Sequence, residues 1–380
     1  MGDSLLCKVA DRLRGLVRKG DIVARMGGDE FTILHVNSSS TTTAESLAKR
    51  VVDVIGRPYA LDGHILNIGA SVGIAVAPDD GTDPDDLLKK ADLALYVAKA
   101  QGRGTLRFFE EEMEARLNAR RALELDLRKA LAIREFKLVY QPQIELATGR
   151  ITGFEALLRW HNADRGLVSP AEFIPLAEEI GAIVPIGEWV LRTACHEAMS
   201  WPAPVKVAVN LSVMQFRSPR LFDSITFALA QSGLPPSRLE LEITESALID
   251  DTQAVLDLLN RVRALGVSVS MDDFGTGYSS LSYLQRFPFD KVKIDQSFVR
   301  GPGSERDKQA IVRAIAGLGA SLGMRTTAEG VETSEQLERM RQEGCTEVQG
   351  YLTGRPLSPN DIAELLATHQ RDVQPGRSPT

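Results

Sequence analysis

The sequence contains only three cysteines, Cys7, Cys195 and Cys345, and they lie far apart. An odd number of widely spaced cysteines, without histidine partners at metal-ligand spacing, argues against a disulfide framework and against a zinc site. No apolar run approaches the roughly 20 residues that a membrane-spanning helix needs, and the N-terminus lacks the apolar core of a signal peptide. We therefore expect buried or idle thiols and a cytoplasmic chain that makes no membrane contact through this segment.

An excess of positive charge is also missing. Lys plus Arg number 44 against 51 for Asp plus Glu, which is a formal net charge of −7. This balance argues against non-specific binding to a DNA or RNA polymer, and an anionic small molecule would need a local cationic site. The composition is 43% hydrophobic and 25% charged, as in folded globular chains, and 380 residues exceed one ordinary domain. We expect two modules, or one large barrel with an appendage.

The first part of the chain predicts a small α+β unit that looks cut at its front. Two short strands flank Gly27 and Gly28 and form a hairpin, with the acidic residues Asp29 and Glu30 just past its tip. Apolar spacing predicts helices at 5–17, 42–55 and 84–101, and strands at 22–26, 31–36, near 65 and at 70–77. Mixed short strands and helices of this kind are typical of an α+β domain.

The rest of the chain predicts a barrel. Residues 110–133 are dense in Glu, Arg, Ala and Leu, which favours a long connecting helix, and strand-like runs then alternate with helical runs, which predicts a closed (β/α)₈ barrel. The eight strands are expected at 137–141, 151–160, 205–211, 239–243, 267–271, 292–294, 324–328 and 347–351. The helices are expected at 171–180, 186–199, 221–231, 252–265, 308–322 and 334–343. The resulting domains are 1–108, a connecting helix at 109–121, the barrel at 122–368 and a disordered tail at 369–380.

Alternation along four of these strands selects a polar inner face. Successive side chains of a strand point to opposite sides, and the outer side of a barrel strand must be apolar to pack on helices. The residues left for the inner face are Glu155 and Arg159, then Asn210, then Glu240 and Glu242, and finally Lys291, Lys293 and Asp295. The same rule therefore holds on four separate strands.

Further polar residues stand where apolar runs end. Asp272 and Asp273 follow one run, Glu329 follows another, and Gln349 precedes Gly350. Active groups of such barrels gather at the C-terminal rim of the strands, so these residues are expected to share one cavity. Oxygen ligands in an acidic cluster favour Mg²⁺ or Mn²⁺. Taken singly, each acid could instead be a helix cap or a solvated loop residue, and Arg159 an ordinary ion-pair partner.

Seven motifs of this region resemble those of the EAL-domain family. They are EALLR (155–159), NLS (210–212), ELEITES (240–246), DDFGTGYSSL (272–281), KID (293–295), AEGVE (328–332) and QGY (349–351). The resemblance covers about 122–368. It implies a TIM-like barrel with an antiparallel first strand, and hydrolysis of cyclic di-GMP to linear pGpG with two Mg²⁺ or Mn²⁺ ions.

The resemblance also assigns roles. It implies that Glu155, Asn210, Glu242 and Asp272 bind one metal, and that Asp272, Asp273 and Glu329 bind the second. Lys293 resembles the lysine that orients the attacking water, so the implied catalytic set is Lys293, Glu329 and Asp272; the alternative for Lys293 is an ion pair with Asp295. Gln349 would support the metal and its water, while Gln141 and Arg159 would hold the substrate. Glu245 resembles the residue that anchors the loop at 272–280 and links dimer contacts to the metal site.

The front domain resembles the GGDEF-domain diguanylate cyclases through ARMGGDEF (24–31) and ADLALYVAKAQGR (91–103). Only its rear part is present, so Asp29 and Glu30 lack the metal-binding Asp that an earlier strand supplies in that family. Lys99 and Arg103 match triphosphate-contacting positions, but Gly104 replaces the usual Asn. We expect no cyclase activity. Arg18 and Asp21, in RKGD, match an inhibitory cyclic di-GMP site of the RxxD type, with a surface ion pair as the alternative.

The leading hypothesis is a metal-dependent cyclic di-GMP phosphodiesterase, with the partial GGDEF unit in a regulatory or dimerising role. The alternative is a receptor that binds cyclic di-GMP without hydrolysing it, which loss of metal ligands would indicate. A bifunctional cyclase and hydrolase is disfavoured by the missing front. A homodimer is expected, and the abrupt start suggests a fragment of a longer sensor protein.

Overall fold

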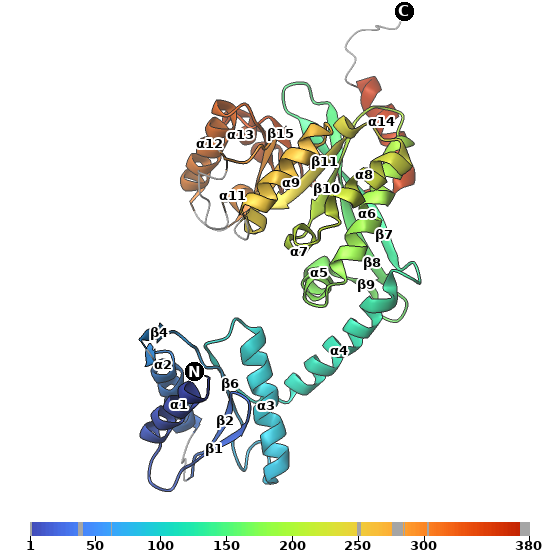
Figure 1. Cartoon of the computed structure of the whole chain (residues 1–380). Helices are drawn as coiled ribbons and strands as arrows, with labels where there is room; N and C mark the ends of the chain where they lie inside the picture. Colours follow the sequence, from blue (N-terminus) through green and yellow to red (C-terminus); the bar gives the residue numbers. More distant parts are fainter. Residues whose placement is uncertain are drawn as a thin grey trace, which may run out of the picture. The chain divides into compact units, whose positions relative to one another are not determined.

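The protein is described by a computed structural model that covers residues 2–36, 41–61, 63–248, 252–275, 284, 286–301 and 304–372. The chain divides into two compact units, Met1–Ala122 and Leu123–Thr380 (Figure 1). Each unit has its own buried apolar cluster, so each is described by itself.

The first unit is an α+β domain, as the sequence predicts. Its elements are α1 (Gly2–Leu16), β1 (Ile22–Gly27), β2 (Glu30–Leu34), α2 (Thr41–Ile55), β3 (Tyr59–Leu61), β4 (His64–Leu66), β5 (Val72–Ile74), α3 (Pro84–Ala100) and β6 (Leu106–Phe108). β1 and β2 form the expected antiparallel hairpin, and β3–β4 and β5–β6 are two further pairs. β3 and β6 are absent from the strands expected from the sequence, and the strand expected at 70–77 is shorter, at Val72–Ile74.

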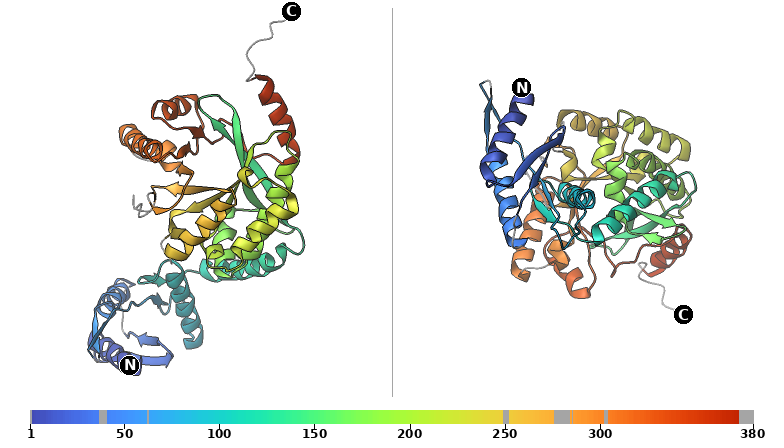
Figure 2. Two further views of the ribbon diagram at one scale, coloured as in Figure 1. Left: turned by 45° about the horizontal axis from the view of Figure 1, so that its top comes forward. Right: turned by 90° about the horizontal axis from the view of Figure 1, so that it is seen from below.

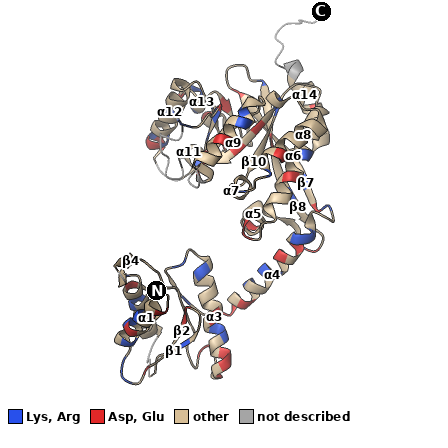
Figure 3. Ribbon diagram, in the orientation of Figure 1, with Lys and Arg blue, Asp and Glu red and all other residues tan. Residues whose placement is uncertain are grey.

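Helix α4 (Glu112–Ala130) carries the boundary between the units. Both signs of charge lie along it (Figure 3), and pairs four residues apart, such as Arg116 with Glu112 and Arg128 with Glu124, support the exposed face. Leu123, Leu127 and Ala130 are buried in the apolar core of the second unit. The C-terminal half of the connecting helix is therefore part of the barrel's own packing.

The second unit is a closed eight-stranded barrel. Its strands are β7 (Phe136–Glu145), β8 (Ile151–Asn162), β10 (Lys206–Leu211), β11 (Leu239–Thr244), β12 (Ser268–Phe274), β13 (Lys291–Ile294), β14 (Arg325–Ala328) and β15 (Glu347–Val348), and β9 (Gly166–Val168) extends the β8 edge. β10 pairs with both β8 and β11, which closes the ring. β7 runs antiparallel to β8 and β15, whereas β8 and β10–β15 are parallel to one another. The TIM-like barrel with an antiparallel first strand is confirmed.

Helices surround the strands (Figure 2). They are α5 (Pro170–Glu179), α6 (Ile183–Met199), α7 (Val213–Phe216), α8 (Leu221–Ser232), α9 (Thr252–Ala264), α11 (Ser297–Arg300), α12 (Glu305–Ser321), α13 (Ser334–Gln342) and α14 (Pro359–Asp372), with short 3₁₀ turns η1 (Pro236–Arg238) and η2 (Glu245–Leu248). The strand residues assigned to the apolar outer face are buried against them, among them Val209, Leu241 and Val292, each 0% exposed. The alternation read from the sequence is thus the alternation of the barrel wall.

Two expectations are wrong in detail. Strand β15 ends at Val348, because from Gly350 the chain turns back on itself with Thr353 and Gly354 donating to the Gly350 carbonyl. The sequence predicts a disordered tail from residue 369, yet α14 continues to Asp372. His369 Nε2 lies 2.6 Å from the carbonyl oxygen of Gly149, a contact with the β7–β8 turn that helps to hold this last helical turn. Residues 373–380 lie outside the described residues.

All three cysteines are free, with Cys7 exposed and the other two buried. Burial raises the pKa of Cys195 and Cys345 to about 12, so both thiols are protonated and unreactive. Among the residues that the structure describes, no helix combines the length and apolarity needed to cross a membrane.

Candidate metal centre

The parallel strands bring the predicted polar residues to one end of the barrel because neighbouring strands lie in register. Asn210 of β10 lies opposite Glu242 of β11, and Thr244 of β11 lies opposite Asp272 of β12. Beyond Asn210, the chain turns sharply because Ser212 starts α7 with a capping box, its hydroxyl accepting from the Met214 amide. The polar residues therefore gather at the C-terminal ends of the strands.

Lys293 is the centre of this gathering. Its side chain is 1% exposed, and its Nζ lies 2.6 Å from Glu329, 2.8 Å from Glu242, 3.1 Å from Asp272 and 3.5 Å from Glu155. Asp295 instead accepts from the backbone amide of Ser297 at the start of α11. The alternative pairing of Lys293 with Asp295 is absent from the contacts of the described residues, and the lysine contacts acids of three other strands and Glu329, which follows β14.

Asp272 and Asp273 both reach the site because β12 has a bulge at these residues, in its pairing with β13. The pairing with β13 shifts from Met271↔Val292 to Phe274↔Ile294, which leaves one extra residue on β12. Asp273 lies in this bulge and adopts the left-handed region, with φ of 52°. Its backbone amide donates to Asp272 Oδ1 at 3.0 Å. Such backbone strain in a non-glycine residue is typical of functional sites.

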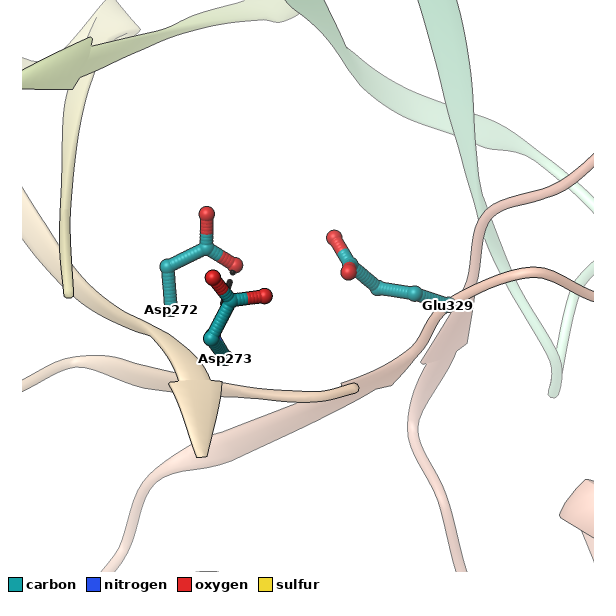
Figure 4. Close-up of side chains that lie close together, drawn as sticks. All are labelled: Asp272, Asp273 and Glu329. Atoms are coloured by element: carbon teal, nitrogen blue, oxygen red, sulfur yellow. Dashed lines mark hydrogen bonds between the residues drawn. The ribbon is translucent and has the colours of Figure 1, made fainter. Parts of the chain in front are cut away.

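Glu329 completes a group of three carboxylates that could hold a metal ion. It follows β14, and one carboxylate oxygen from each of Asp272, Asp273 and Glu329 lies within 4.8 Å of the others (Figure 4). Glu155 adjoins this group through Lys293, whose Nζ lies 3.5 Å from Glu155, and the Asn210 amide donates to Glu155 at 2.6 Å. We call Glu155, Glu242, Asp272, Asp273 and Glu329, with Lys293 among them, the acidic cluster.

The acidic cluster carries an unbalanced charge. Five carboxylates against one ammonium leave four negative charges when every group is ionised. Burial, together with the charge of Asp272, raises the pKa of Glu329 to about 8, although Lys293 opposes the shift. Burial and Asp272 also raise the pKa of Asp273 to about 6. Bound divalent cations would remove this repulsion, because two of them carry four positive charges.

The pKa values of the other members of the acidic cluster depend on which groups each one contacts. Burial raises the pKa of Glu242 well above its usual range, and the charges of Glu155 and Asp272 add to the effect. For Glu155, the opposing pull of Lys293 and hydrogen bonds from Gln349 and Asn210 outweigh burial and lower the pKa. Burial alone would lower the pKa of Lys293, but the surrounding carboxylates hold it well above its usual value. The lysine is therefore a permanent cation.

Two predicted glutamines lie beside the cluster. Gln349 donates to Glu155 Oε2 at 2.6 Å and to Gln141 Oε1 at 3.2 Å. The backbone after Gln349 passes so close to Val331 that a Cβ at Gly350 would lie 2.1 Å from the Val331 carbonyl oxygen. Only glycine fits there, which explains the Gly in the QGY motif.

Arg159 and Glu245 stand at the margin. Arg159 is half-buried and donates to the carbonyl oxygen of Leu158 at 2.9 Å, and burial lowers its pKa while Tyr351 and Glu155 oppose the shift. Glu245 is buried in η2, directly after β11. The loop that the resemblance expects it to anchor, at 272–280, is described only as far as residue 275, so residues 276–280 of that prediction lie outside the described residues.

The candidate residues of the first unit are engaged locally. Asp21 accepts from the backbone amides of Arg18 at 2.8 Å and Val36 at 3.1 Å, and it lies 3.0 Å from His35 Nδ1. Glu30 lies beside the hairpin turn and pairs with Lys99 at 3.4 Å. Asp21 therefore acts as a structural acceptor within its own unit, while the Arg18 side chain is exposed.

A second polar layer lies deeper in the barrel, and sequence reasoning misses it as a unit. We call Lys206, Glu240, Lys291, Arg325 and Glu347 the basal ionic layer. Lys291 is 1% exposed and lies 2.7 Å from Glu240 and 2.8 Å from Glu347. Alternation places Glu240 and Lys291 on the inner face, but it does not single out Glu347. The available signal is spacing, because Glu240, Lys291 and Glu347 each precede a rim residue by two positions.

Family models match both parts of the chain. One described as EAL domain matches residues 124–356, and one described as Diguanylate cyclase, GGDEF domain matches residues 1–105. Both resemblances found in the sequence are therefore confirmed, and the second covers a partial domain.

Individual proteins are also similar to this chain. The chain is 45% identical over 373 residues to Bifunctional diguanylate cyclase/cyclic di-GMP phosphodiesterase MucR of Pseudomonas aeruginosa, a match over 97% of this chain and 54% of that protein. It is 42% identical over 379 residues to Cyclic di-GMP phosphodiesterase NbdA of the same organism, over 98% and 48%. The chain spans about half the length of the curated relatives it matches. The solved structure PaMucR Phosphodiesterase, c-di-GMP complex, is 45% identical with a TM-score of 0.61, over 63% of this chain and 99% of that one.

Proposed function

This chain belongs to the EAL-domain family, and from that premise we propose that its barrel hydrolyses cyclic di-GMP to linear pGpG. The observation that carries the proposal is the acidic cluster, in which the carboxylates of Asp272, Asp273 and Glu329 meet within 4.8 Å at the rim of the barrel. Relatives that match nearly the whole chain are named cyclic di-GMP phosphodiesterases, and the PaMucR structure is titled as a c-di-GMP complex.

The residues of the cluster fit two divalent metal ions. They supply only oxygen ligands, which suits Mg²⁺ or Mn²⁺, and their four uncompensated charges match two such ions. Glu155, Asn210, Glu242 and Asp272 would hold one ion, and Asp272, Asp273 and Glu329 the other. When bound, the ions supply a water of lowered pKa and stabilise negative charge on the phosphoryl oxygens.

The neighbouring side chains would position the reactants. Lys293 is a permanent cation in contact with four carboxylates, so it would offset charge that develops on the phosphate, and in this proposal it also orients the attacking water. Gln349 keeps Glu155 oriented. Arg159 and Gln141 would bind the phosphate and base of the substrate, for which a guanidinium and an amide offer suitable donors.

The first unit would regulate rather than synthesise. Glu30 is paired with Lys99, and the GGDEF family model matches residues 1–105 of the chain. In this proposal it tunes the barrel or supports a homodimer. Cyclic di-GMP binding at Arg18 and Asp21 would require Asp21 to exchange its contacts with Val36 and His35 for the ligand.

A metal-dependent assay tests the proposal. Purified protein with Mn²⁺ should convert cyclic di-GMP to pGpG, resolved by nucleotide chromatography, and a chelator should stop the reaction. Asp272→Asn should lower kcat by more than the roughly 100-fold that loss of an outer-shell partner can cause, since Asp272 is assigned to both ions. Glu338→Gln, an exposed acid on α13, is the matched control and should be unchanged. Cyclic di-GMP that binds but stays intact would favour the receptor alternative.

A further inference from the structure

A directed chain of side-chain hydrogen bonds connects the basal ionic layer to the acidic cluster. Lys291 Nζ donates to Gln143 Oε1 at 3.0 Å, and Gln143 Nε2 donates to Gln349 Oε1 at 3.1 Å and to Glu242 Oε1 at 3.3 Å. Gln349 Nε2 then donates to Glu155 and to Gln141, and Gln141 Nε2 donates to the Gly354 carbonyl at 3.1 Å. Gln143, 2% exposed, is the link between the two layers.

The direction of this chain has a physical origin. An amide can turn over and exchange its oxygen and nitrogen, but an ammonium has donors only. Lys291 therefore requires the oxygen of Gln143 to face it, which turns the Gln143 NH₂ toward Gln349 and Glu242. A reversed Gln143 would set NH₂ against the ammonium and oxygen against two acceptors.

The same rule continues to the rim. Because Gln143 donates to the oxygen of Gln349, the NH₂ of Gln349 is left for Glu155, a predicted metal ligand. Lys291 is itself held in place by ion pairs with Glu240 and Glu347, whose carboxylate oxygens lie 2.7 and 2.8 Å from its Nζ. A cation near the base of the barrel thus sets the orientation of an amide at the rim.

We propose that Lys291 and Gln143 are positioning residues that fix the amide polarity of Gln349, and through it the orientation of Glu155 for metal binding. The inference rests on the proposed function, because it assumes that the acidic cluster binds divalent cations. Outer-shell hydrogen bonds that orient metal ligands typically change metal affinity by about 10–100-fold when removed.

The direction in which Mn²⁺ affinity changes distinguishes this positioning role from a through-space effect of charge. Gln143→Glu keeps the shape but has no donor when ionised, so it faces Glu242 and the Gln349 oxygen with a second acceptor. Its extra negative charge, acting through space, would tighten cation binding. Loss of the fixed orientation of the Gln349 amide would instead weaken cation binding, and we expect the Kd for Mn²⁺ to rise about tenfold or more. Gln143→Met, which has neither donor nor charge, should weaken binding in the same direction.

Isothermal titration of the full chain with Mn²⁺ measures this without turnover, and circular dichroism checks that each variant is folded. Lys206→Met is the matched control, since Lys206 joins the basal ionic layer through its contacts with Glu240 and Ser268 rather than through the amide chain. It should bind Mn²⁺ as tightly as the wild type or slightly more tightly. Gln143 variants with unchanged or tighter binding would overturn the inference alone. A wild type that binds no Mn²⁺ would overturn the proposed function and this inference with it.

Discussion

At the scale of single residues, the pKa of Glu329 reflects the burial and the negative charge of its site. It is largely buried, it contacts Lys293 at 2.6 Å, and burial with the charge of Asp272 raises its pKa to about 8. A carboxyl group whose folded pKa is raised stabilises the folded state most below its unfolded value of about 4.5. That contribution is lost as the pH rises through about 8.

In chelator, the metal-free protein should therefore become less stable between about pH 4.5 and pH 8. Glu329→Gln mimics the protonated group, and it should remove on the order of a few kcal/mol of this dependence. Denaturant unfolding at a series of pH values measures the effect. Asp273, with its pKa raised to about 6, adds a smaller loss in the same direction that the variant retains. An unaltered pH slope in Glu329→Gln would contradict the assignment.

At the scale of elements, the bulge of β12 decides the geometry of the candidate metal centre. A regular strand would send Asp272 and Asp273 to opposite faces. The extra residue and the left-handed φ of 52° at Asp273 bring both carboxylates to the same side. The sequence DD predicts two acids at a strand end, but it does not reveal the bulge that makes them neighbours.

Two variants test this conformation, and both remove the carboxylate. Asparagine tolerates the left-handed region better than alanine does, because its short amide forms local hydrogen bonds. Asp273→Asn should therefore be more stable to unfolding than Asp273→Ala, by about 1 kcal/mol. Chemical denaturation in chelator gives the comparison free of metal effects. Equal stability, or a more stable alanine variant, would show that the residue does not keep this φ in solution.

At the scale of the molecule, the C-terminal half of α4 is part of the barrel's core. Leu123 and Leu127 of α4 are 3% and 1% exposed and pack in the core of the second unit. The first unit has a separate core built from α1, α2 and Tyr59. The two units therefore have separate apolar cores.

A fragment spanning 109–380 should fold cooperatively and hydrolyse cyclic di-GMP within severalfold of the full chain. A fragment beginning at Glu135, which lacks α4, should be less stable by about 1.5–3 kcal/mol for each lost leucine. Thermal melts followed by circular dichroism, together with the chromatographic assay, compare the two. Failure of the longer fragment to fold would show that the barrel depends on the first unit.

Much of the fold can be predicted because two periodicities are local properties of a chain. Alternation identifies the inner face of β8, β10, β11 and β13, and it alone places Glu155, Glu242 and Lys293 on the polar side. Strands of two or three residues, such as β15 and β9, give too little pattern to be bounded or detected. Helix α14 (Pro359–Asp372) is absent from the helices expected from the sequence, and the contact of its last turn with Gly149 joins positions 220 residues apart, which a local pattern does not reveal.

The sequence by itself determined the barrel, its polar interior and the identity of the acids at its rim, because side-chain alternation and the positions of strand ends are encoded locally. Only the tertiary structure decided which groups share an ammonium, that Asp272 and Asp273 face the same way, and that Gln143 joins two polar layers. These depend on register and on the hand of a single φ angle. Residues such as Lys291 and Gln143, 148 positions apart, meet only when the ring of strands closes.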